Sequence, residues 1–461
     1  MPTDQPRTEP QLAVLTGELP KGPAPARTLA AAMLGSALIT LDATVVTVAL
    51  PAIGSSLGGG MAGLQWVVDA YTLALAALML STGAFSDRAG ASRAYALGVT
   101  VFTLASAACG LAPNLPALIG ARAVQGLAAA AVLPASLALV RQAYADRARR
   151  ARAVATWAVG GSTALALGPV AGGALTTAWG WRGIFFVNLP LGVAALVLLL
   201  RAPRSERRPA PLDLPGQVMA VLALTAVTFA VIEGGTTGLV AFAVAVAAVA
   251  LFVRIESRQA HPVVPPGLFR DRAVRVAVAA GSACSVAFYG MIFLFSLFFQ
   301  QVQQRSALCA GLLFLPMTGL IAVTNMASGK LAGRYGPRLP LLLGQALAVL
   351  GLLALFTIDA HTPTVAVAVL LVPTGLGVAL AVPTLTVVML DAVPAERAGL
   401  AAGVLNSARQ VSGGLGIAVF GALTSGGFAT GLRPSLAVAA ALLSVTFLLS
   451  CRLAGRPARR S

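Results

Sequence analysis

The sequence predicts an all-α polytopic membrane protein, and three observations support this prediction. First, hydrophobic residues make up 58% of the 461 residues, charged residues make up only 10%, and the mean hydropathy is +0.87. Because soluble proteins carry about 25% charged residues, this chain lacks the polar surface that it would need in water. Second, fourteen apolar runs approach or exceed the length of about 20 residues that a transmembrane helix requires. Third, the basic residues fall almost entirely on alternate connectors.

The fourteen runs follow one another along the chain and predict fourteen transmembrane helices. Their approximate cores are residues 29–50, 64–84, 94–112, 115–140, 153–175, 183–200, 216–233, 237–253, 274–299, 308–328, 339–358, 364–390, 399–424 and 434–451. The runs are too long for the strands of a membrane barrel, which span about 9–11 residues and alternate in polarity. The first run is long and lacks a small-residue cleavage site, so we expect a retained helix and not a signal peptide.

The basic residues orient these helices. If the N-terminus is cytoplasmic, 27 of the 32 lysines and arginines lie on the cytoplasmic side, 3 lie outside, and Arg122 and Arg409 lie within helices. This is a strong positive-inside signal, so we expect both termini in the cytoplasm of a bacterium and the helices in its inner membrane. The net charge of +17 then reflects anchors that touch anionic lipid headgroups, and not a nucleic-acid-binding surface.

Two connectors indicate an internal duplication. Residues 83–90 read Gly-Ala-Phe-Ser-Asp-Arg-Ala-Gly, and residues 329–336 read Gly-Lys-Leu-Ala-Gly-Arg-Tyr-Gly. They follow the second and the tenth run, which places two six-helix halves around two inserted helices. The expected divisions are an N-terminal tail 1–28, a six-helix bundle 29–205, two linker helices 206–260, a second six-helix bundle 261–452 and a tail 453–461.

Several motifs resemble a known family. Residues 41–51 read Leu-Asp-Ala-Thr-Val-Val-Thr-Val-Ala-Leu-Pro, and residues 122–126 read Arg-Ala-Val-Gln-Gly. The fifth run contains Gly-Gly, Gly-Pro and Gly-Gly pairs between residues 160 and 173, and residues 181–190 read Trp-Arg-Gly-Ile-Phe-Phe-Val-Asn-Leu-Pro. Together with the connector 83–93, these motifs resemble the fourteen-helix drug:proton antiporters of the major facilitator superfamily, the QacA/EmrB-like group that includes antibiotic resistance exporters. The resemblance implies the major facilitator fold.

Three ionisable residues within the apolar runs are candidates for proton coupling. An ionised side chain in hydrocarbon is costly and usually faces a cavity or a partner. Taking Pro51 as the outer end of the first helix, Asp42 lies about 13 Å deep, Arg122 about 10 Å deep, and Asp69 is shallower. The resemblance implies that Asp42 takes up the proton and that Arg122 modulates it. Alternatively, Asp42 and Arg122 form a static pair that fixes helix packing, and Asp69 is equally compatible with a structural role.

Two sets of residues resemble the conformational motifs of the family. In the first connector, we expect Gly83 and Gly90 to permit a tight turn, while Asp87 and Arg88 pair with neighbouring helix ends and form a latch. In the fifth run, small glycine surfaces allow close helix approach, and a proline tends to kink the helix. These residues are Gly168, Pro169, Gly172 and Gly173. Glycine in ordinary membrane packing is the alternative.

Three further polar residues lie near or within helices. Glu233 ends the seventh run, where it joins proton transfer, attracts cations, or is merely solvated at the outer surface. Arg409 and Gln410 lie about ten residues into the thirteenth run, at a depth where they need a partner or water. They either contact substrate in a central cavity or serve a structural hydrogen bond.

The remaining composition excludes several classes of function. The 4 cysteines form no CxxC pair and the 2 histidines lie in connectors, so we expect no metal, cofactor or disulfide framework. The sequence contains no Ser/His/Asp constellation of an enzyme and no GxxxxGK[ST] phosphate loop. We therefore expect a monomeric, non-enzymatic transporter in which the proton gradient drives the efflux of small amphipathic drugs or antibiotics. The alternative is a facilitator-type transporter of a metabolite, lipid or nutrient.

Overall fold

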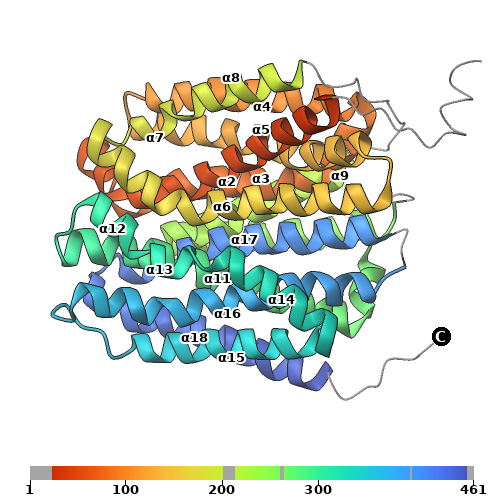
Figure 1. Cartoon of the computed structure of the whole chain (residues 1–461). Helices are drawn as coiled ribbons and strands as arrows, with labels where there is room; N and C mark the ends of the chain where they lie inside the picture. Colours follow the sequence, from red (N-terminus) through yellow and green to blue (C-terminus); the bar gives the residue numbers. More distant parts are fainter. Residues whose placement is uncertain (1–22, 201–212, 260–263, 395–396, 454–461) are drawn as a thin grey trace, which may run out of the picture.

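The computed structural model describes residues 23–200, 213–259, 264–394 and 397–453. Within these ranges every regular element is a helix, as the sequence predicts (Figure 1). The long helices lie roughly side by side, and their ends gather at two opposite ends of the molecule. We call the end where the first helix begins and the last helix finishes the terminal end, and the opposite end the far end.

The N-terminal group of helices covers the first six predicted runs. It consists of α2 (Pro23–Leu57), α3 (Gly60–Ala89), α4 (Ala91–Gly110), α5 (Leu115–Ala143), α6 (Arg147–Trp179), α7 (Gly183–Phe186) and α8 (Asn188–Leu199). Helix α2 packs against α5, α6 and α8, and α5 also packs against α3 and α4. The short α7 and the longer α8 together form the sixth run.

A hairpin of two helices follows. Helix α9 (Leu214–Glu233) and helix α10 (Gly235–Glu256) pack along one another, and α9 also contacts α3 and the later helix α17 (Ala398–Thr424). The turn between them uses Gly234 and Gly235, whose φ angles are 60° and 56°. Glycine adopts this left-handed conformation without the steric cost that a β-carbon imposes, which allows the chain to reverse within two residues.

The C-terminal group covers the last six predicted runs. It consists of the 3₁₀ helix η1 (Pro266–Arg270), α11 (Arg272–Leu297), the π-helix η2 (Phe298–Val302), α12 (Ala307–Leu313), α13 (Leu315–Thr318), α14 (Ile321–Tyr335), α15 (Arg338–Leu355), α16 (Thr364–Asp391), α17 (Ala398–Thr424) and α18 (Phe428–Leu453). Helix α11 lies against α16, α17 and α18 and is buried over nearly its whole length.

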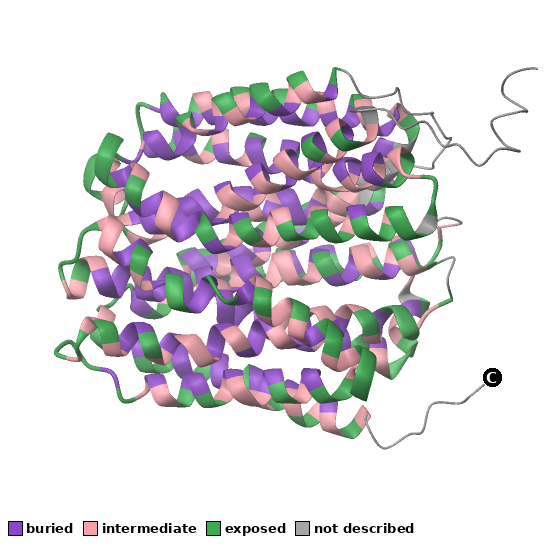
Figure 2. Cartoon of the chain, viewed as in Figure 1, coloured by how far each residue is buried: buried purple, intermediate pink, exposed green. Residues whose placement is uncertain are grey.

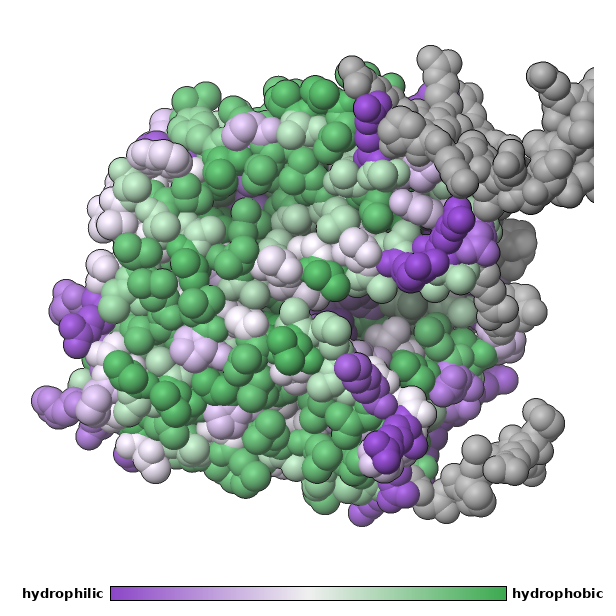
Figure 3. Space-filling model, viewed as in Figure 1, coloured by the Kyte–Doolittle hydropathy of each residue, from purple (hydrophilic) through white to green (hydrophobic). Residues whose placement is uncertain are grey.

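The surface is that of a multi-pass membrane protein. Eleven helices are long and apolar enough to cross a membrane, and the segment Gly183–Leu199 is a shorter apolar helix. Large apolar side chains cover the flanks, among them Leu104, Val240 and Val365, which are 67%, 65% and 70% exposed. Figure 2 shows exposed residues along the outward sides of the helices, and Figure 3 shows a broad apolar flank between polar ends. An exposed apolar surface of this extent is typical of a protein embedded in a membrane. The count of fourteen spans stays a prediction.

Two helices extend further than the sequence predicts. Helix α2 continues past Pro51 to Leu57, so Pro51 lies inside the helix and does not mark its end. Helix α3 continues to Ala89, and Gly90 alone, with φ 88°, forms the turn that we expected over residues 83–90. Gly336, with φ 81°, forms the corresponding turn between α14 and α15. The two related connectors therefore share a one-glycine turn.

The two groups of helices are joined most closely at the far end. There, Gln65 Nε2 donates to the Ala418 carbonyl at 2.6 Å, and Gln300 Nε2 donates to the Val48 carbonyl at 2.9 Å. Helix α6 also packs against α12 at this end. At the terminal end, by contrast, Figure 3 shows a hollow between the upper and the lower half of the molecule. The structure is therefore closed at the far end and opens toward the terminal end.

Candidate functional site

A buried ion pair lies in the middle of the N-terminal group. Arg122 on α5 donates from Nη1 to Asp42 Oδ2 on α2, and the two side chains are 0% and 1% exposed. The guanidinium also lies over the ring of Tyr71, with 4.2 Å from Cζ to the ring centroid. This ring is a favourable neighbour for a cation that has lost its water. The structure thus brings together the two residues that the sequence placed in one layer.

Two amide side chains complete the environment of Asp42. Asn188 Nδ2, at the start of α8, donates to Asp42 Oδ1 at 2.8 Å, and Gln125 Nε2 donates to the same oxygen at 3.4 Å. Arg122 Nη1 in turn donates to Gln125 Oε1 at 3.0 Å. Gln125 and Asn188 lie within the family-like motifs, but sequence reasoning gave them no role. A polar amide within an apolar run is the signal that could have identified them.

The depth of Asp42 differs from the sequence estimate. Asp42 lies 15 residues before Leu57, which corresponds to about 22 Å along the helix axis and places it near the middle of α2. The estimate of about 13 Å was wrong because it took Pro51 as the helix end. A proline inside a membrane helix is tolerated when neighbouring groups satisfy the freed carbonyl.

Asp69 lies apart from this ion pair, on the face of α3 that meets α17. Its side chain is fully buried, and neither carboxyl oxygen has a hydrogen-bond partner among the described residues. A β-carbon built on Gly414 of α17 would lie 3.1 Å from Asp69 Oδ1, so the carboxyl lies directly against the other group of helices. An unpaired buried carboxylate costs several kcal/mol, whereas a protonated carboxyl group does not carry this penalty.

Glu233, Arg409 and Gln410 lie elsewhere. Glu233 is exposed at the end of α9, where it accepts a hydrogen bond from Trp66 Nε1 at 3.3 Å. Arg409 and Gln410 are half-buried on α17. The aliphatic part of the Arg409 side chain lies against α11, because a β-carbon on Gly281 would be 3.2 Å from Arg409 Cγ. The Nε atom of Arg409 is buried and has no hydrogen-bond partner among the described residues. None of the three joins the Asp42–Arg122 pair.

The glycines of α6 lie where backbones approach closely. A β-carbon on Gly168 would lie 1.8 Å from Thr44 Oγ1, and one on Gly172 would lie 2.6 Å from the Val45 carbonyl oxygen, both on α2. On the other side, a β-carbon on Gly173 would lie 2.3 Å from the Ala307 carbonyl oxygen of α12. Pro169, inside α6, similarly faces α12, because its carbonyl oxygen would lie 2.3 Å from a β-carbon on Gly311.

The residues of the connector after α3 are less fully described. Arg88 is exposed in the last turn of α3, and Gly90 forms the turn itself. Gly83 lies inside α3 and forms no turn, so the expected tight turn at this glycine was wrong. The side chain of Asp87 lies outside the described residues.

We expect Asn188→Ala to destabilise the protein by about 1.5–3 kcal/mol, because it removes a hydrogen bond to a buried carboxylate. Chemical unfolding in detergent micelles measures this difference. The matched control is Asn406→Ala, because Asn406 is exposed on α17 and its amide lies 4.0 Å from Met79 Sδ, a weak acceptor. Equal stabilities of the two variants would contradict the assignment.

Comparison with known proteins relates the chain as a whole to a family of membrane transporters. The model of the Major Facilitator Superfamily matches residues 32–417. The chain is 40% identical over 417 residues to the multidrug resistance protein Stp of Mycobacterium tuberculosis, covering 89% of this chain and 78% of the relative. It is 37% identical over 437 residues to a methylenomycin A resistance protein of Streptomyces coelicolor, covering 93% of this chain and 92% of the relative.

Solved structures share the fold at low sequence identity. A bacterial homologue of the human lysosomal transporter Spinster, in an inward-facing and unoccupied conformation, superposes with a TM-score of 0.70 at 17% identity, covering 95% of this chain and 100% of that chain. A D-xylose–proton symporter superposes with a TM-score of 0.67 at 13% identity, covering 92% and 96% of the two chains. At these identities the likeness supports the fold alone.

Proposed function

Because the chain belongs to the Major Facilitator Superfamily, we propose that it exports small amphipathic drugs or antibiotics in exchange for protons. Two observations support this proposal. Relatives at 40% and 37% identity are named as a multidrug resistance protein and a methylenomycin A resistance protein. The core also holds the buried pair of Asp42 and Arg122, an arrangement that is costly in a membrane protein and suited to proton exchange.

The proposed architecture is that of a fourteen-helix exporter. Two six-helix bundles, residues 29–205 and 261–452, rock about a site between them. The linker helices of residues 206–260 lie beside the seam, by which we mean the contact between α3 of the first bundle and α17 of the second. Both termini are cytoplasmic, so the described conformation is open toward the cytoplasm. In alternating access, the contacts at the far end separate while the terminal end closes.

The ion pair provides the coupling chemistry. The observation that carries the proposal is that Arg122 Nη1 contacts both Asp42 and Gln125, the latter at 3.0 Å. When Arg122 moves onto Gln125 alone, it keeps a hydrogen bond while Asp42 loses its counter-charge. Asp42 then takes up a proton, because the neutral acid is the form that tolerates burial without a cation.

Asp69 provides a second proton site in this scheme. It is buried against Gly414 in the described conformation, and separation of α3 from α17 exposes it to the far side. Arg409 and Gln410 lie on α17 beside the same seam, where we propose that they contact substrate. Glu233 attracts protons or cations at the exposed end of α9.

The test is Asp42→Asn, assayed by proton-driven drug uptake into everted membrane vesicles. We expect uptake to fall to the level of vesicles without the protein, because asparagine cannot exchange a proton. Gradient-driven uptake that equals the wild type would overturn the proposal, as would wild-type uptake that survives collapse of the proton gradient by an uncoupler.

The matched control is Asp359→Asn in the exposed connector between α15 and α16. Hydrogen bonds from Thr362 and from the His361 backbone hold the pKa of Asp359 below its usual value, so this aspartate is ionised at neutral pH. The control therefore removes a negative charge of the same kind, but outside the membrane. We expect it to transport like the wild type.

A further inference from the structure

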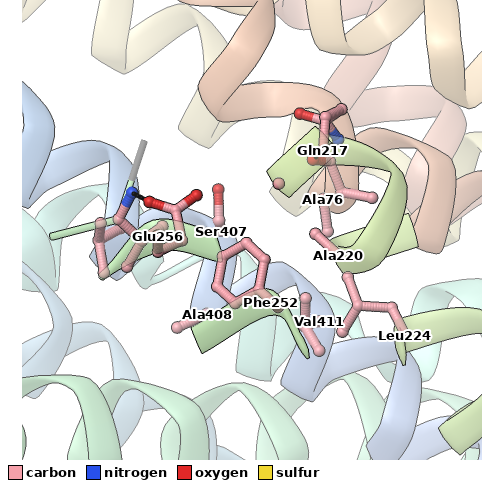
Figure 4. Close-up of a pocket in the computed structure, with 13 residues that line it drawn as sticks. Ala76, Gln217, Ala220, Leu224, Phe252, Glu256, Ser407, Ala408 and Val411 are labelled. Carbon is pink, nitrogen blue, oxygen red and sulfur yellow. Dashed lines mark hydrogen bonds between the residues drawn. The ribbon is translucent and has the colours of Figure 1, made fainter. Parts of the chain in front are cut away.

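A cavity of about 180 Å³ lies where the hairpin of α9 and α10 covers the seam between α3 and α17. It is closer to the terminal end than to the far end, since its lining comes from the first half of α9 and the second half of α10. Its walls are mainly apolar and include Leu224, Phe252, Val404 and Val411 (Figure 4). An apolar cavity of about 150 Å³ accommodates benzene, so this one has room for a ring with a small head group.

A pair of acids lies at one end of this cavity. Asp213 precedes α9, and its Oδ1 accepts from the Gly216 backbone at 2.8 Å and from Gln259 Nε2 at 2.6 Å. Glu256, which ends α10 and lines the cavity, accepts from the Val264 backbone at 2.9 Å through Oε2. A β-carbon on Gly216 would lie 2.2 Å from Asp213 Oδ2 and 2.6 Å from Glu256 Oε1, so the two acids converge on this glycine.

The two acids share one proton. Asp213 Oδ2 and Glu256 Oε1 would both lie within 2.6 Å of one β-carbon on Gly216, and a second negative charge is disfavoured where two carboxyl groups share one site. Asp213 also accepts two hydrogen bonds through Oδ1, from the Gly216 backbone and from Gln259, and these bonds favour its ionised form. Asp213 is therefore the better-stabilised carboxylate of the pair, and the shared proton lies on Glu256. The pair, which is 6% and 2% exposed, carries one net negative charge.

A hydroxyl group points to the same cavity and lacks a partner. Ser407 on α17 lines the cavity, is 8% exposed, and its Oγ has no hydrogen-bond partner among the described residues. Most buried hydroxyl groups are hydrogen-bonded, so an unsatisfied one indicates a place for a ligand donor. Figure 4 shows the oxygens of Ser407 and Glu256 on the same side of the cavity, above the ring of Phe252.

We propose that this cavity binds the protonated amine of an amphipathic compound. The ammonium group lies at the Asp213–Glu256 pair and donates to Ser407 Oγ, while the apolar part of the compound lies against Phe252 and Leu224. One positive charge balances the single negative charge of the pair. This inference rests on the proposed function, because it makes amphipathic amines a substrate class and the linker hairpin a part of their entry route.

The test is equilibrium binding of tritiated phenethylamine to the purified full chain in lipid nanodiscs, without a proton gradient. We expect saturable binding that the uncharged isostere propylbenzene does not displace. Asp213→Asn combined with Glu256→Gln removes the charge and is expected to weaken binding about thirtyfold or more. Ser407→Ala, which removes only the hydroxyl, is expected to weaken binding about tenfold.

Asp391→Asn is the matched control. It replaces an exposed acid at the end of α16 that does not line the cavity, so we expect wild-type affinity. Equal affinity of the double variant and the wild type, or equally tight binding of propylbenzene, overturns the site. Thermal unfolding of each variant shows that the binding measured is that of folded protein.

The outcomes separate this site from the proposed function. Binding involves no gradient, so loss of proton-driven uptake in Asp42→Asn does not affect it. Conversely, unchanged phenethylamine affinity in the double variant overturns the amine site and leaves proton-coupled export standing.

Discussion

Arg122→Ala is expected to destabilise the protein by about 3–5 kcal/mol, the largest stability effect in the candidate site. The substitution leaves the carboxylate of Asp42, which is 2% exposed, buried without its counter-ion. It also removes the hydrogen bond from Arg122 Nε to the Val67 carbonyl at 3.1 Å, which ties α5 to α3. Chemical unfolding in detergent micelles, followed by circular dichroism, measures the loss.

Two controls test whether the loss of stability comes from the Asp42–Arg122 pair. Arg433→Ala removes an exposed arginine from α18 and is expected to change stability by less than about 0.5 kcal/mol. The double variant Asp42→Asn with Arg122→Gln removes both charges and should be more stable than the sum of the single variants predicts, by about 0.5–3 kcal/mol. A coupling energy near zero would show that the two side chains do not depend on one another.

The existence of the Asp42–Arg122 pair could be predicted from sequence, but its surroundings could not. An acid and a base that both lie within apolar helices are each costly unless they are paired, so their positions in the apolar runs already predict an ion pair. Which amides reach them depends on how each helix is rotated about its axis. Asn188 reaches Asp42 from α8 across 146 positions of chain, and no spacing in the sequence encodes that contact.

The helices themselves were predictable because lipid requires long apolar runs. All fourteen runs coincide with helices of the structure. The sixth is divided between α7 and α8, the ninth continues from α11 into η2, and the tenth is divided among α12, α13 and α14. The third and eleventh runs extend two and three residues past the ends of α4 and α15. Their ends were not predictable in the same way, because a helix can continue beyond the lipid. Helix α2 thus extends to Leu57, and α3 reaches Gly90, where a single left-handed glycine replaces the longer connector that we expected.

The acid pair of the linker hairpin shows a second limit of sequence reasoning. Asp213 lies just before one apolar run and Glu256 lies just after the next one, at positions where charged residues are ordinarily solvated. Only the packing of α9 along α10 brings their carboxyl groups together over Gly216. The charges along the sequence predict which connectors lie on the same side of the membrane. They do not distinguish a solvated acid from a buried one.

Gly173→Val is expected to prevent closure of the far end and to abolish transport. The β-carbon alone would lie 2.3 Å from the Ala307 carbonyl oxygen, and since this atom belongs to the backbone of α12, no side chain can move aside. Overpacking of this kind costs about 1–3 kcal/mol, which shifts a two-state equilibrium by about tenfold to a hundredfold toward the open far end. The valine therefore favours the conformation in which α6 and α12 are apart.

Labelling from outside the cell measures this shift. In a background without the native cysteines, Thr47→Cys places a thiol on α2 at a position that is 4% exposed beside the far-end contacts with α11. We expect a membrane-impermeant maleimide to react with it at least about tenfold faster when Gly173→Val is present. Gly120→Val is the control, because no atom lies within 4 Å of a β-carbon at that helical glycine. Slow labelling in both variants, together with lost transport in Gly173→Val, would show that the α6–α12 contact does not control opening of the far end.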